Sequence, residues 1–543
     1  MTDHHHDPID RILHILQSKH VETIKNVLLA YAVYYYSTSV IGLMFKVVFF
    51  RGDIRKAFRS LLQSLILGVR RYVPGIDAQV QKEVAKSVAG MEKGIIIGAR
   101  DKKYTKLPAK GLDTASLRME MQKYQKLSHV DFKDGKVSGA VYHGGAELNA
   151  LLTEAYHMNI LSNPLHPEMF PGVRKMESEV IQMVLSMYNA PEDAGGNITS
   201  GGTESILMAV KAARDFMEAK KGITTPNMVV PETVHPAFDK AAQYFKIQMI
   251  KIPVDPVTFK VNLKKVRAAI NRNTVLLVGS CPNYPHGIVD DIPALSKLAL
   301  RYRIPLHVDA CLGGFIVPFV DKAGFPYPDV FDFRNEGVTS ISCDTHKYGF
   351  APKGSSVVMF RTKELRNYEY FITTEWQGGV YASPTMAGSR PGALVAACWA
   401  AMVHFGESGY VDSTRKIVGK VRKLKAAIHG IPELELIGDP MMSVIAFRGK
   451  DDFPIFGIID LLSRKNWHLT PLQQPSGIHL STTYVTDEDQ LIADIKEAVA
   501  IVKKDPKSAM GESAAIYGTV ASIPDRTIIR DVAKGFLDLL TKI

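Results

Sequence analysis

RIPLHVDACLGG, residues 303–314, places an aspartate directly after a short apolar run, and VTSISCDTHKYG, residues 338–349, places Asp344 and Lys347 after another. Both runs have the length and the β-branched residues of buried strands. Similar runs, separated by helix-like stretches, occur at NMVVP (227–231), TVLLVGS (274–280) and SSVVMF (355–360). Strands that alternate with helices predict an α/β fold with a mostly parallel sheet covered by helices.

The pattern changes on both sides of this α/β region. We expect a large domain over residues 136–395 and a smaller α+β domain over 396–510, where short strands such as MMSVIAFRG and GIHLSTTYV follow two helices. A polar, helix-prone segment at 51–135 precedes the large domain, and an extension at 511–543 ends in a final helix near 527–542. A chain of 543 residues is too long for one ordinary core, which agrees with this division.

Composition excludes several classes of protein. Hydrophobic residues make up 46% of the chain and charged residues 22%, so the chain is not largely disordered. The net charge of +11 favours an anionic partner, but the chain lacks a basic tract with interleaved aromatic residues, so we expect no nucleic acid. The four cysteines have the spacing of neither a zinc site nor a disulfide framework, so we expect reduced thiols and no metal.

The N-terminal region predicts one membrane anchor. Residues 26–45, NVLLAYAVYYYSTSVIGLMF, carry no formal charge, and about 20 apolar residues cross a bilayer as a helix; a buried core helix is the alternative. By the positive-inside rule, the side after the run is cytosolic because it carries Lys46, Arg51, Arg55, Lys56, Arg59, Arg70 and Arg71. We therefore expect a lumenal tail over residues 1–25 and a single transmembrane helix over 26–50.

Residues at the carboxyl ends of the predicted strands are candidates for chemistry, because ligands of parallel α/β sheets bind beyond these ends. Asp309 ends a buried strand and needs a partner, for which a protonated pyridine nitrogen is suitable; an ordinary helix N-cap is the alternative. Lys347 follows another strand and can form a Schiff base in a cleft if its pKa is lowered. A surface lysine is the alternative for this residue.

Two further motifs suit a phosphorylated heteroaromatic ligand. TSGGTES, residues 199–205, precedes a helical pattern, and the free N–H groups of a helix N-terminus can hold a phosphate. The same residues also form ordinary turns and N-caps. His235 comes just before another helix, where an imidazole can stack on a flat ring or have a structural role.

In this order, the motifs resemble those of the group II decarboxylase branch of pyridoxal-phosphate enzymes, which have the aspartate-aminotransferase-like fold. The resemblance covers roughly residues 140–500 and implies that pyridoxal 5'-phosphate is the cofactor. It implies that Lys347 carries the cofactor as a Schiff base, that Asp309 pairs with the pyridinium nitrogen, and that His235 stacks on the ring. The residues implied to hold the cofactor phosphate are Gly202, Thr203 and His346.

Within that branch, the sequence is similar to the sphingosine-1-phosphate lyase family. The similarity is carried by strings such as VSGAVYHGG (137–145), NPLHPEMFPGVRKMESEV (163–180), DTHKYGFAPKG (344–354) and GGVYASPTMAGSRPG (378–392). The single N-terminal anchor is also typical of that family. The similarity implies cleavage of the C2–C3 bond of phosphorylated sphingoid bases to a fatty aldehyde and phosphoethanolamine. It also implies a place in the endoplasmic reticulum membrane, with the catalytic domain in the cytosol.

The same similarity implies roles for residues outside the cofactor motifs. Phosphate prefers cationic and hydroxyl donors, and the implied donors to the substrate phosphate are Tyr142, His166 and Lys353. Tyr284 is implied to lie near the reacting carbons. The base that takes the C3 hydroxyl proton stays open from the sequence, and the candidates are Tyr142, Tyr284, Lys347 and a phosphate oxygen. The loop at 378–390 resembles a segment that completes the site of a second subunit, with Ser389 contacting the cofactor phosphate across the interface. A homodimer with shared active sites is therefore expected.

Two other functions remain open from the sequence. An amino-acid decarboxylase would share every cofactor residue, but it needs neither an anchor nor Tyr142, His166 and Lys353 together. A membrane-tethered binding protein with a decayed site would lack the lysine or the aspartate, and both are present.

Overall fold

The computed structural model describes residues 76–98, 102–128, 130–506, 511 and 526–543. These residues belong to two compact units, one made of the chain up to residue 129 together with residues from 519 onward, and the other spanning 130–518. The predicted membrane span at 26–50 lies outside the described residues. Among the helices that are described, none has the length and apolar character needed to cross a membrane.

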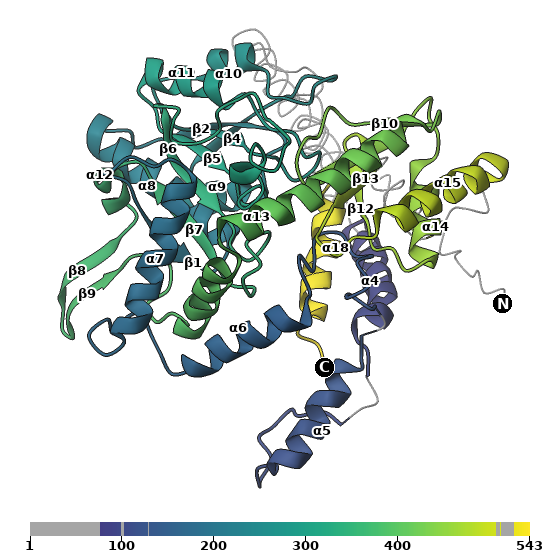
Figure 1. Ribbon diagram of the computed structural model, residues 1–543, viewed down its shortest axis with the longest axis horizontal. Helices are drawn as coiled ribbons and strands as arrows, with labels where there is room; N and C mark the ends of the chain where they lie inside the picture. Colours follow the sequence, from purple (N-terminus) through teal and green to yellow (C-terminus); the bar gives the residue numbers. More distant parts are fainter. Residues whose placement is uncertain (1–75, 99–101, 129, 507–510, 512–525) are drawn as a thin grey trace, which may run out of the picture. The chain divides into compact units, whose positions relative to one another are not determined.

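A seven-stranded sheet forms the centre of the unit at 130–518 (Figure 1). All its strands run in the same direction except β7, which is antiparallel to both of its neighbours. In spatial order the strands are β1 (Gly195–Thr199), β7 (Ser356–Phe360), β6 (Val338–Cys343), β5 (Leu306–Asp309), β4 (Thr274–Ser280), β2 (Asn227–Pro231) and β3 (Gln248–Ile252). The predicted mostly parallel sheet is confirmed.

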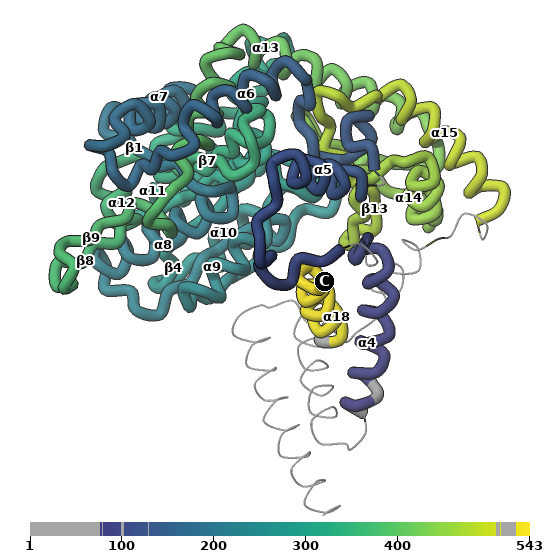
Figure 2. Tube along the Cα trace, turned by 90° about the horizontal axis from the view of Figure 1, so that it is seen from below, coloured from purple at the N-terminus to yellow at the C-terminus, as the bar shows by residue number. Residues whose placement is uncertain are grey.

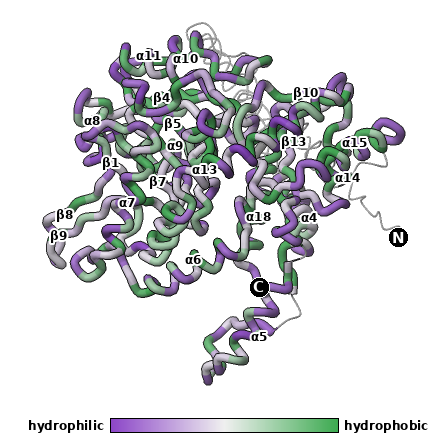
Figure 3. Tube along the Cα trace, in the orientation of Figure 1, coloured by the Kyte–Doolittle hydropathy of each residue, from purple (hydrophilic) through white to green (hydrophobic). Residues whose placement is uncertain are grey.

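The composition of the central strands explains why this sheet is covered on both faces. Every residue of β2, β4 and β5 is buried, and such strands read as continuous apolar runs rather than alternating ones. Figure 3 shows hydrophobic stretches of the chain running through this region.

The helices that precede α13 (Gly392–His429) in this unit are α6 (Ala146–Met158), α7 (Pro171–Met187), α8 (Gly202–Lys221), α9 (Ala237–Phe245), α10 (Leu263–Ala269), α11 (Ile292–Tyr302), the short 3-10 helix η1 (Val317–Phe319) and α12 (Lys363–Asn367).

A long helix, α13 (Gly392–His429), connects the sheet region to the rest of the unit. The sequence predicts two helices here, at 391–405 and 413–429, and the structure confirms two helical segments within α13 that meet at Gly406, whose φ of 57° and ψ of −174° are not helical. Before α13, the strands β8 (Phe371–Trp376) and β9 (Gly379–Ser383) form a hairpin with mostly exposed side chains. The predicted domain boundary at 395/396 falls in the first turn of α13.

The chain after α13 forms a small α+β region with its own apolar core. A four-stranded antiparallel sheet pairs β10 (Leu434–Leu436), β11 (Val444–Gly449), β13 (Ser476–Ser481) and β12 (Thr470–Gln473) in that order. The helices α14 (Ile455–Arg464) and α15 (Glu488–Lys504) pack on each other and supply buried residues such as Ile458 and Ile495.

The other unit contains α4 (Ile76–Ile95), α5 (Thr114–Gln125) and α18 (Arg526–Leu539). α4 and α18 lie side by side (Figures 1 and 2), and an ion pair of 2.7 Å joins Lys542 to Glu92. Gly535 allows the close approach, because a Cβ at this position would lie 2.4 Å from a methyl carbon of Val88. The final helix expected from the sequence is present as α18.

Candidate active site

Five strands bring the sequence motifs to one edge of the large sheet. β1, β2, β4, β5 and β6 all point the same way, so their carboxyl ends share an edge. β1 leads into the N-terminus of α8, and β2, β4 and β6 lead to His235, Tyr284 and Lys347. Asp309 is the last residue of β5. This edge is where ligands bind in parallel α/β sheets.

Asp309 is a buried carboxylate held by hydrogen bonds. Its side chain is 7% exposed, and its Oδ1 accepts hydrogen bonds from the Cys311 backbone N–H (3.0 Å) and the Ser342 hydroxyl (3.4 Å). The Ser342 hydroxyl also lies 3.1 Å from Nε2 of His307, and burial lowers the pKa of His307 to about 4. The His307 ring is therefore neutral near pH 7 and supplies no cation to Asp309, so the Asp309 side chain is available to a cationic ligand atom such as a pyridinium nitrogen.

The N-terminus of α8 lies against the chain that follows β5 and β6. A Cβ on Gly202 would come within 2.7 Å of Cys311 Sγ and 2.8 Å of Asp344 Oδ1, so only glycine fits this position without movement of its neighbours. The first helical hydrogen bond here runs from Ser205 N–H to Gly201, which leaves the N–H groups of Gly202 and Thr203 without an acceptor inside the helix. Such groups fit a phosphate.

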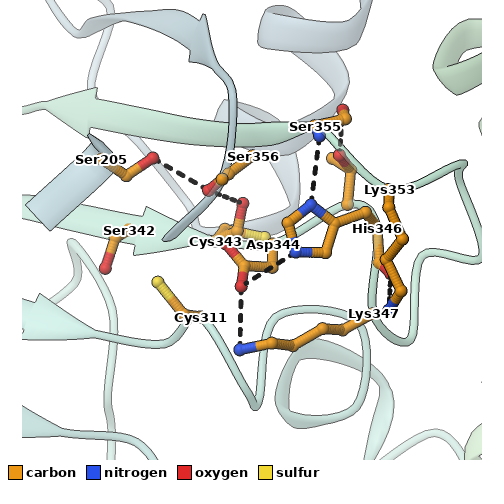
Figure 4. Close-up of polar contacts among 12 residues, drawn as sticks. Ser205, Cys311, Ser342, Cys343, Asp344, His346, Lys347, Lys353, Ser355 and Ser356 are labelled. Atoms are coloured by element: carbon orange, nitrogen blue, oxygen red, sulfur yellow. Dashed lines mark hydrogen bonds and ion pairs between the residues drawn. The ribbon is translucent and has the colours of Figure 1, made fainter. Parts of the chain in front are cut away.

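Lys347 and His346 are partly exposed and form a polar cluster with the buried Asp344 (Figure 4). Lys347 Nζ is 2.8 Å from Asp344 Oδ2, and His346 Nε2 is 3.6 Å from the same oxygen. His346 Nδ1 accepts the Ser355 backbone N–H at 3.1 Å, which orients the ring. The sequence places Asp344 at a strand end without giving it a role, and only its burial, with 2% of the residue exposed, identifies it as part of the site.

His235 is fixed at the start of α9. Its Nδ1 accepts the Ala237 backbone N–H at 3.1 Å, and the residue is half-buried. Because it follows β2, the ring lies at the same sheet edge as Asp309 and Lys347. A pyridine ring that carries a phosphate and pairs with Asp309 therefore fits the residues gathered at this edge.

A cleft of about 600 Å³ opens beside Lys347, and its walls are of two kinds. Lys347, Lys353 and Tyr142 supply polar groups, and Lys353 Nζ lies 4.4 Å from the centre of the Tyr142 ring. Partial burial lowers the pKa of Lys353 to about 8, and the Lys347 ammonium adds to this shift. Burial also raises the pKa of Tyr142, which keeps its proton near neutral pH. The apolar wall consists of Phe132, Val141, Leu148, Leu152, Phe350 and Leu394.

Tyr284 lies on a hydrogen-bonded loop after β4. Its ring stacks on His479 with centroids 4.3 Å apart, and the residue is 41% exposed. The Asn283 side chain accepts the His286 backbone N–H at 3.1 Å, and the Asp290 carboxylate accepts the Ser280 N–H at 2.9 Å. Tyr284 is not among the residues that line the cleft described above.

His166 and Ser389 are both exposed and do not line this cleft within one chain. They lie on neighbouring loops, because the Arg390 backbone N–H donates to the Asn163 side chain (3.1 Å) and the Gly392 N–H donates to the Ser162 carbonyl (3.0 Å). The structure therefore brings Tyr142 and Lys353 together, but not His166 with them. It also places Ser389 on the surface that carries His166.

Comparison with known proteins agrees with this geometry. Residues 106–450 match the pyridoxal-dependent decarboxylase conserved domain. Sphingosine-1-phosphate lyase 1 of Rattus norvegicus is 44% identical over 508 residues, which cover 93% of this chain and 88% of the relative. Sphingosine-1-phosphate lyase of Saccharomyces cerevisiae is 46% identical over 499 residues, or 90% of this chain and 83% of the relative.

Solved structures lead to the same family. Burkholderia pseudomallei sphingosine-1-phosphate lyase aligns with a TM-score of 0.72 and 38% identity, over 76% of this chain and 96% of the solved one. Glutamate decarboxylase of Lactobacillus brevis, at 20% identity and a TM-score of 0.64 over 74% of this chain and 96% of that one, shares the fold. The chain thus has the α/β fold of pyridoxal-dependent decarboxylases and belongs to the sphingosine-1-phosphate lyase family.

Proposed function

We propose that this protein is a pyridoxal-phosphate-dependent lyase that cleaves the C2–C3 bond of phosphorylated sphingoid bases, releasing a long-chain aldehyde and phosphoethanolamine. The observation that carries the proposal is the cleft beside Lys347, which combines a second cation, Lys353, with an extended apolar wall. A phosphorylated amine with a long alkyl chain needs both kinds of surface. An amino-acid decarboxylase is the alternative.

The cofactor is held by residues at the sheet edge. Lys347 would bond to it covalently, the Asp309 carboxylate would pair with its ring nitrogen, and the His235 ring would stack on it. Gly202, Thr203 and His346 would hold its phosphate. Bound pyridoxal phosphate supplies an electron sink for the carbanion that C2–C3 cleavage leaves on the substrate.

The other residues bind the substrate and handle its protons. Lys353 and Tyr142 donate hydrogen bonds to the substrate phosphate, and the apolar wall takes the alkyl chain. Because Tyr142 keeps its proton, it serves as a hydrogen-bond donor rather than as the base that takes the C3 hydroxyl proton. Tyr284, Lys347 or an oxygen of the substrate phosphate takes that proton.

Lys353→Ala tests whether Lys353 binds the substrate phosphate. Removing this cation is expected to lower kcat/KM for a phosphorylated sphingoid base roughly ten- to hundred-fold. This loss corresponds to the free energy of a charged hydrogen bond, about 1.5–3 kcal/mol. Cofactor absorbance should be retained, because the cofactor phosphate has other donors. The measurement is kcat/KM together with cofactor occupancy and Tm. Unchanged kcat/KM at full occupancy would remove Lys353 from the site of the substrate phosphate.

Lys353→Arg is the matched control and adds a pH readout. With a pKa of about 8, Lys353 is charged below this pH and loses its charge as the pH rises through it. The wild-type kcat/KM should therefore fall above pH 8, where the substrate phosphate stays dianionic because its second pKa is about 6. Arginine keeps its charge throughout, so this alkaline fall should shift to higher pH in the variant.

We also propose that residues 26–50 anchor the chain in the endoplasmic reticulum membrane, with the tail in the lumen and the catalytic part in the cytosol. The charge-free run at 26–45 and the basic residues after it support this arrangement. A membrane location suits an enzyme whose substrate is a lipid.

Deletion of residues 1–50 is expected to release the protein from membranes and to leave its intrinsic chemistry intact. The deletion removes the proposed anchor, and every residue of the sheet edge lies beyond position 130. Vesicle flotation and kcat/KM with a detergent-solubilised substrate are the measurements. A truncated protein that still floats with vesicles would move the anchor to residues 57–69, AFRSLLQSLILGV, whose sequence has the pattern of an amphipathic helix with basic ends.

Finally, we propose a homodimer in which each subunit completes the other's substrate site. His166 and Ser389 lie on one exposed surface rather than in their own chain's cleft, which supports this arrangement. Apolar side chains near the same loops are exposed to an extent that suits a covered interface. They are Met158 (76%), Ile160 (60%), Leu161 (86%), Met169 (68%) and Met386 (60%).

A further inference from the structure

A single carboxylate oxygen lies between the two side chains that end the DTHK string. Asp344 Oδ2 is 2.8 Å from Lys347 Nζ and 3.6 Å from His346 Nε2 (Figure 4). Burial opposes ionisation of Asp344, but Lys347 and His346 outweigh burial and lower its pKa. For Lys347, burial acts to lower the pKa, yet the nearby Asp344 raises it above its ordinary value. Both groups are therefore charged near neutral pH.

The backbone holds this pair in one geometry. The turn after β6 is closed by a hydrogen bond from Ala351 N–H to the Thr345 carbonyl, and the Thr345 and Ser355 hydroxyls also bond. On its other side, Asp344 abuts the N-terminus of α8 at Gly202. The positive end of a helix favours a carboxylate there. The turn and the N-terminus of α8 thus set the position of Asp344 independently of the Lys347 side chain.

We propose that Asp344 is a positioning residue that receives the Lys347 ammonium whenever a substrate amine has displaced this lysine from the cofactor. The inference rests on the proposed function. In the exchange, the carbon–nitrogen bond to Lys347 breaks and one to the substrate nitrogen forms. The substrate ammonium gives up two protons and Lys347 Nζ gains two, so the charge balances and Lys347 leaves as an ammonium.

An ammonium released into a buried site needs a counter-charge within hydrogen-bonding distance. Asp344 supplies that charge 2.8 Å away and stabilises the state in which the substrate, not Lys347, is bonded to the cofactor. While paired, the ammonium has no free electron pair, so Lys347 does not take the C3 hydroxyl proton. That task then falls to Tyr284 or to an oxygen of the substrate phosphate.

The test measures displacement of Lys347 in the full-length holoenzyme. Asp344→Asn and wild type are titrated with methylamine and, separately, with a 3-deoxy phosphorylated sphingoid base, which exchanges but has no C3 hydroxyl to support cleavage. Borohydride reduction and peptide mass spectrometry then give the fraction of Lys347 still bonded to the cofactor. The half-displacing concentration of both amines should rise roughly ten- to hundred-fold in the variant. Equal curves for the two proteins would overturn the proposal.

Two controls keep the result specific. Asp332→Asn removes another fully buried carboxylate, which forms an ion pair of 2.9 Å with Arg334 and does not lie at the sheet edge that carries the site. This variant should leave the titration unchanged. The second control is the Tm of Asp344→Asn, which should match wild type because asparagine keeps the size of the side chain that packs against Gly202; a titration shift that comes with a loss of folded protein would show that packing, not charge, matters, and would overturn the proposal. If the phosphorylated amine fails to displace Lys347 in wild type, the proposed function is contradicted, and the methylamine titration still decides the role of Asp344.

Discussion

Lys347→Ala is expected to lower turnover of a phosphorylated sphingoid base by at least roughly 10³-fold, because the variant has no amine that can bond to the cofactor. The visible absorbance of the lysine-bound cofactor should disappear with the activity. The substitution also leaves the Asp344 carboxylate without its cation, which should reduce the free energy of unfolding by about 1–3 kcal/mol. Turnover, an absorbance spectrum and Tm are measured on the same preparation.

Lys347→Arg is the matched control, since it keeps a cation beside Asp344 but cannot form the bond. It should be as inactive as the alanine variant while being more stable. Substantial turnover in either variant would remove Lys347 from its assigned role.

Co-expression of Lys347→Ala chains with His166→Ala chains tests the proposed dimer. If the sites are shared, about half of the dimers are mixed and one of their two sites is intact, so roughly a quarter of wild-type activity should return.

Asp309→Asn is expected to retain cofactor and lose about 10²–10³-fold in turnover. A neutral amide cannot keep the pyridine nitrogen protonated, so the carbanion loses its electron sink. The fold should survive, because an amide oxygen can still accept the hydrogen bonds from Cys311 N–H and the Ser342 hydroxyl. Turnover is compared at matched cofactor occupancy.

Ser342→Ala is a suitable companion variant. It removes one hydrogen bond to Asp309 and leaves the carboxylate charge in place, so turnover should fall less than about tenfold. A loss in Ser342→Ala as large as in Asp309→Asn would show that orientation, not charge, is the main contribution of the aspartate. Near-normal turnover in Asp309→Asn would mean that another residue protonates the ring.

The sheet and the functional residues at the carboxyl ends of its strands could be predicted from the sequence, because both depend on short, local sequence patterns. Continuous apolar runs such as TVLLVGS have one stable place, a strand buried on both faces. A polar residue that ends or closely follows such a run must lie at the sheet edge, and this rule predicts the positions of Asp309 and Lys347. Lys353 could be placed in the same cleft as Lys347 because it lies only six positions further along the chain.

The remaining features depend on contacts between residues distant in the sequence. The reversed direction of β7 follows from its pairing with both β1 and β6, which no local pattern reports. The sequence places Asp344 at a strand end, but its burial depends on packing against Gly202, which lies far away in the chain. The predicted partnership of His166 with Tyr142 and Lys353 does not form within one chain, and a second subunit is needed to test it. The anchor at 26–50 lies outside the described residues.

The close approach of α8 to the strand ends also limits how this site can change in evolution or by design. The missing Cβ of Gly202 is the space occupied by Cys311 Sγ and the Asp344 carboxylate, at 2.7 and 2.8 Å from where that atom would be. The three residues come from three separate segments of the chain, yet their sizes are set jointly. Substituting any one of them with a larger side chain requires a smaller one at another, so variation at positions 202, 311 and 344 should be correlated.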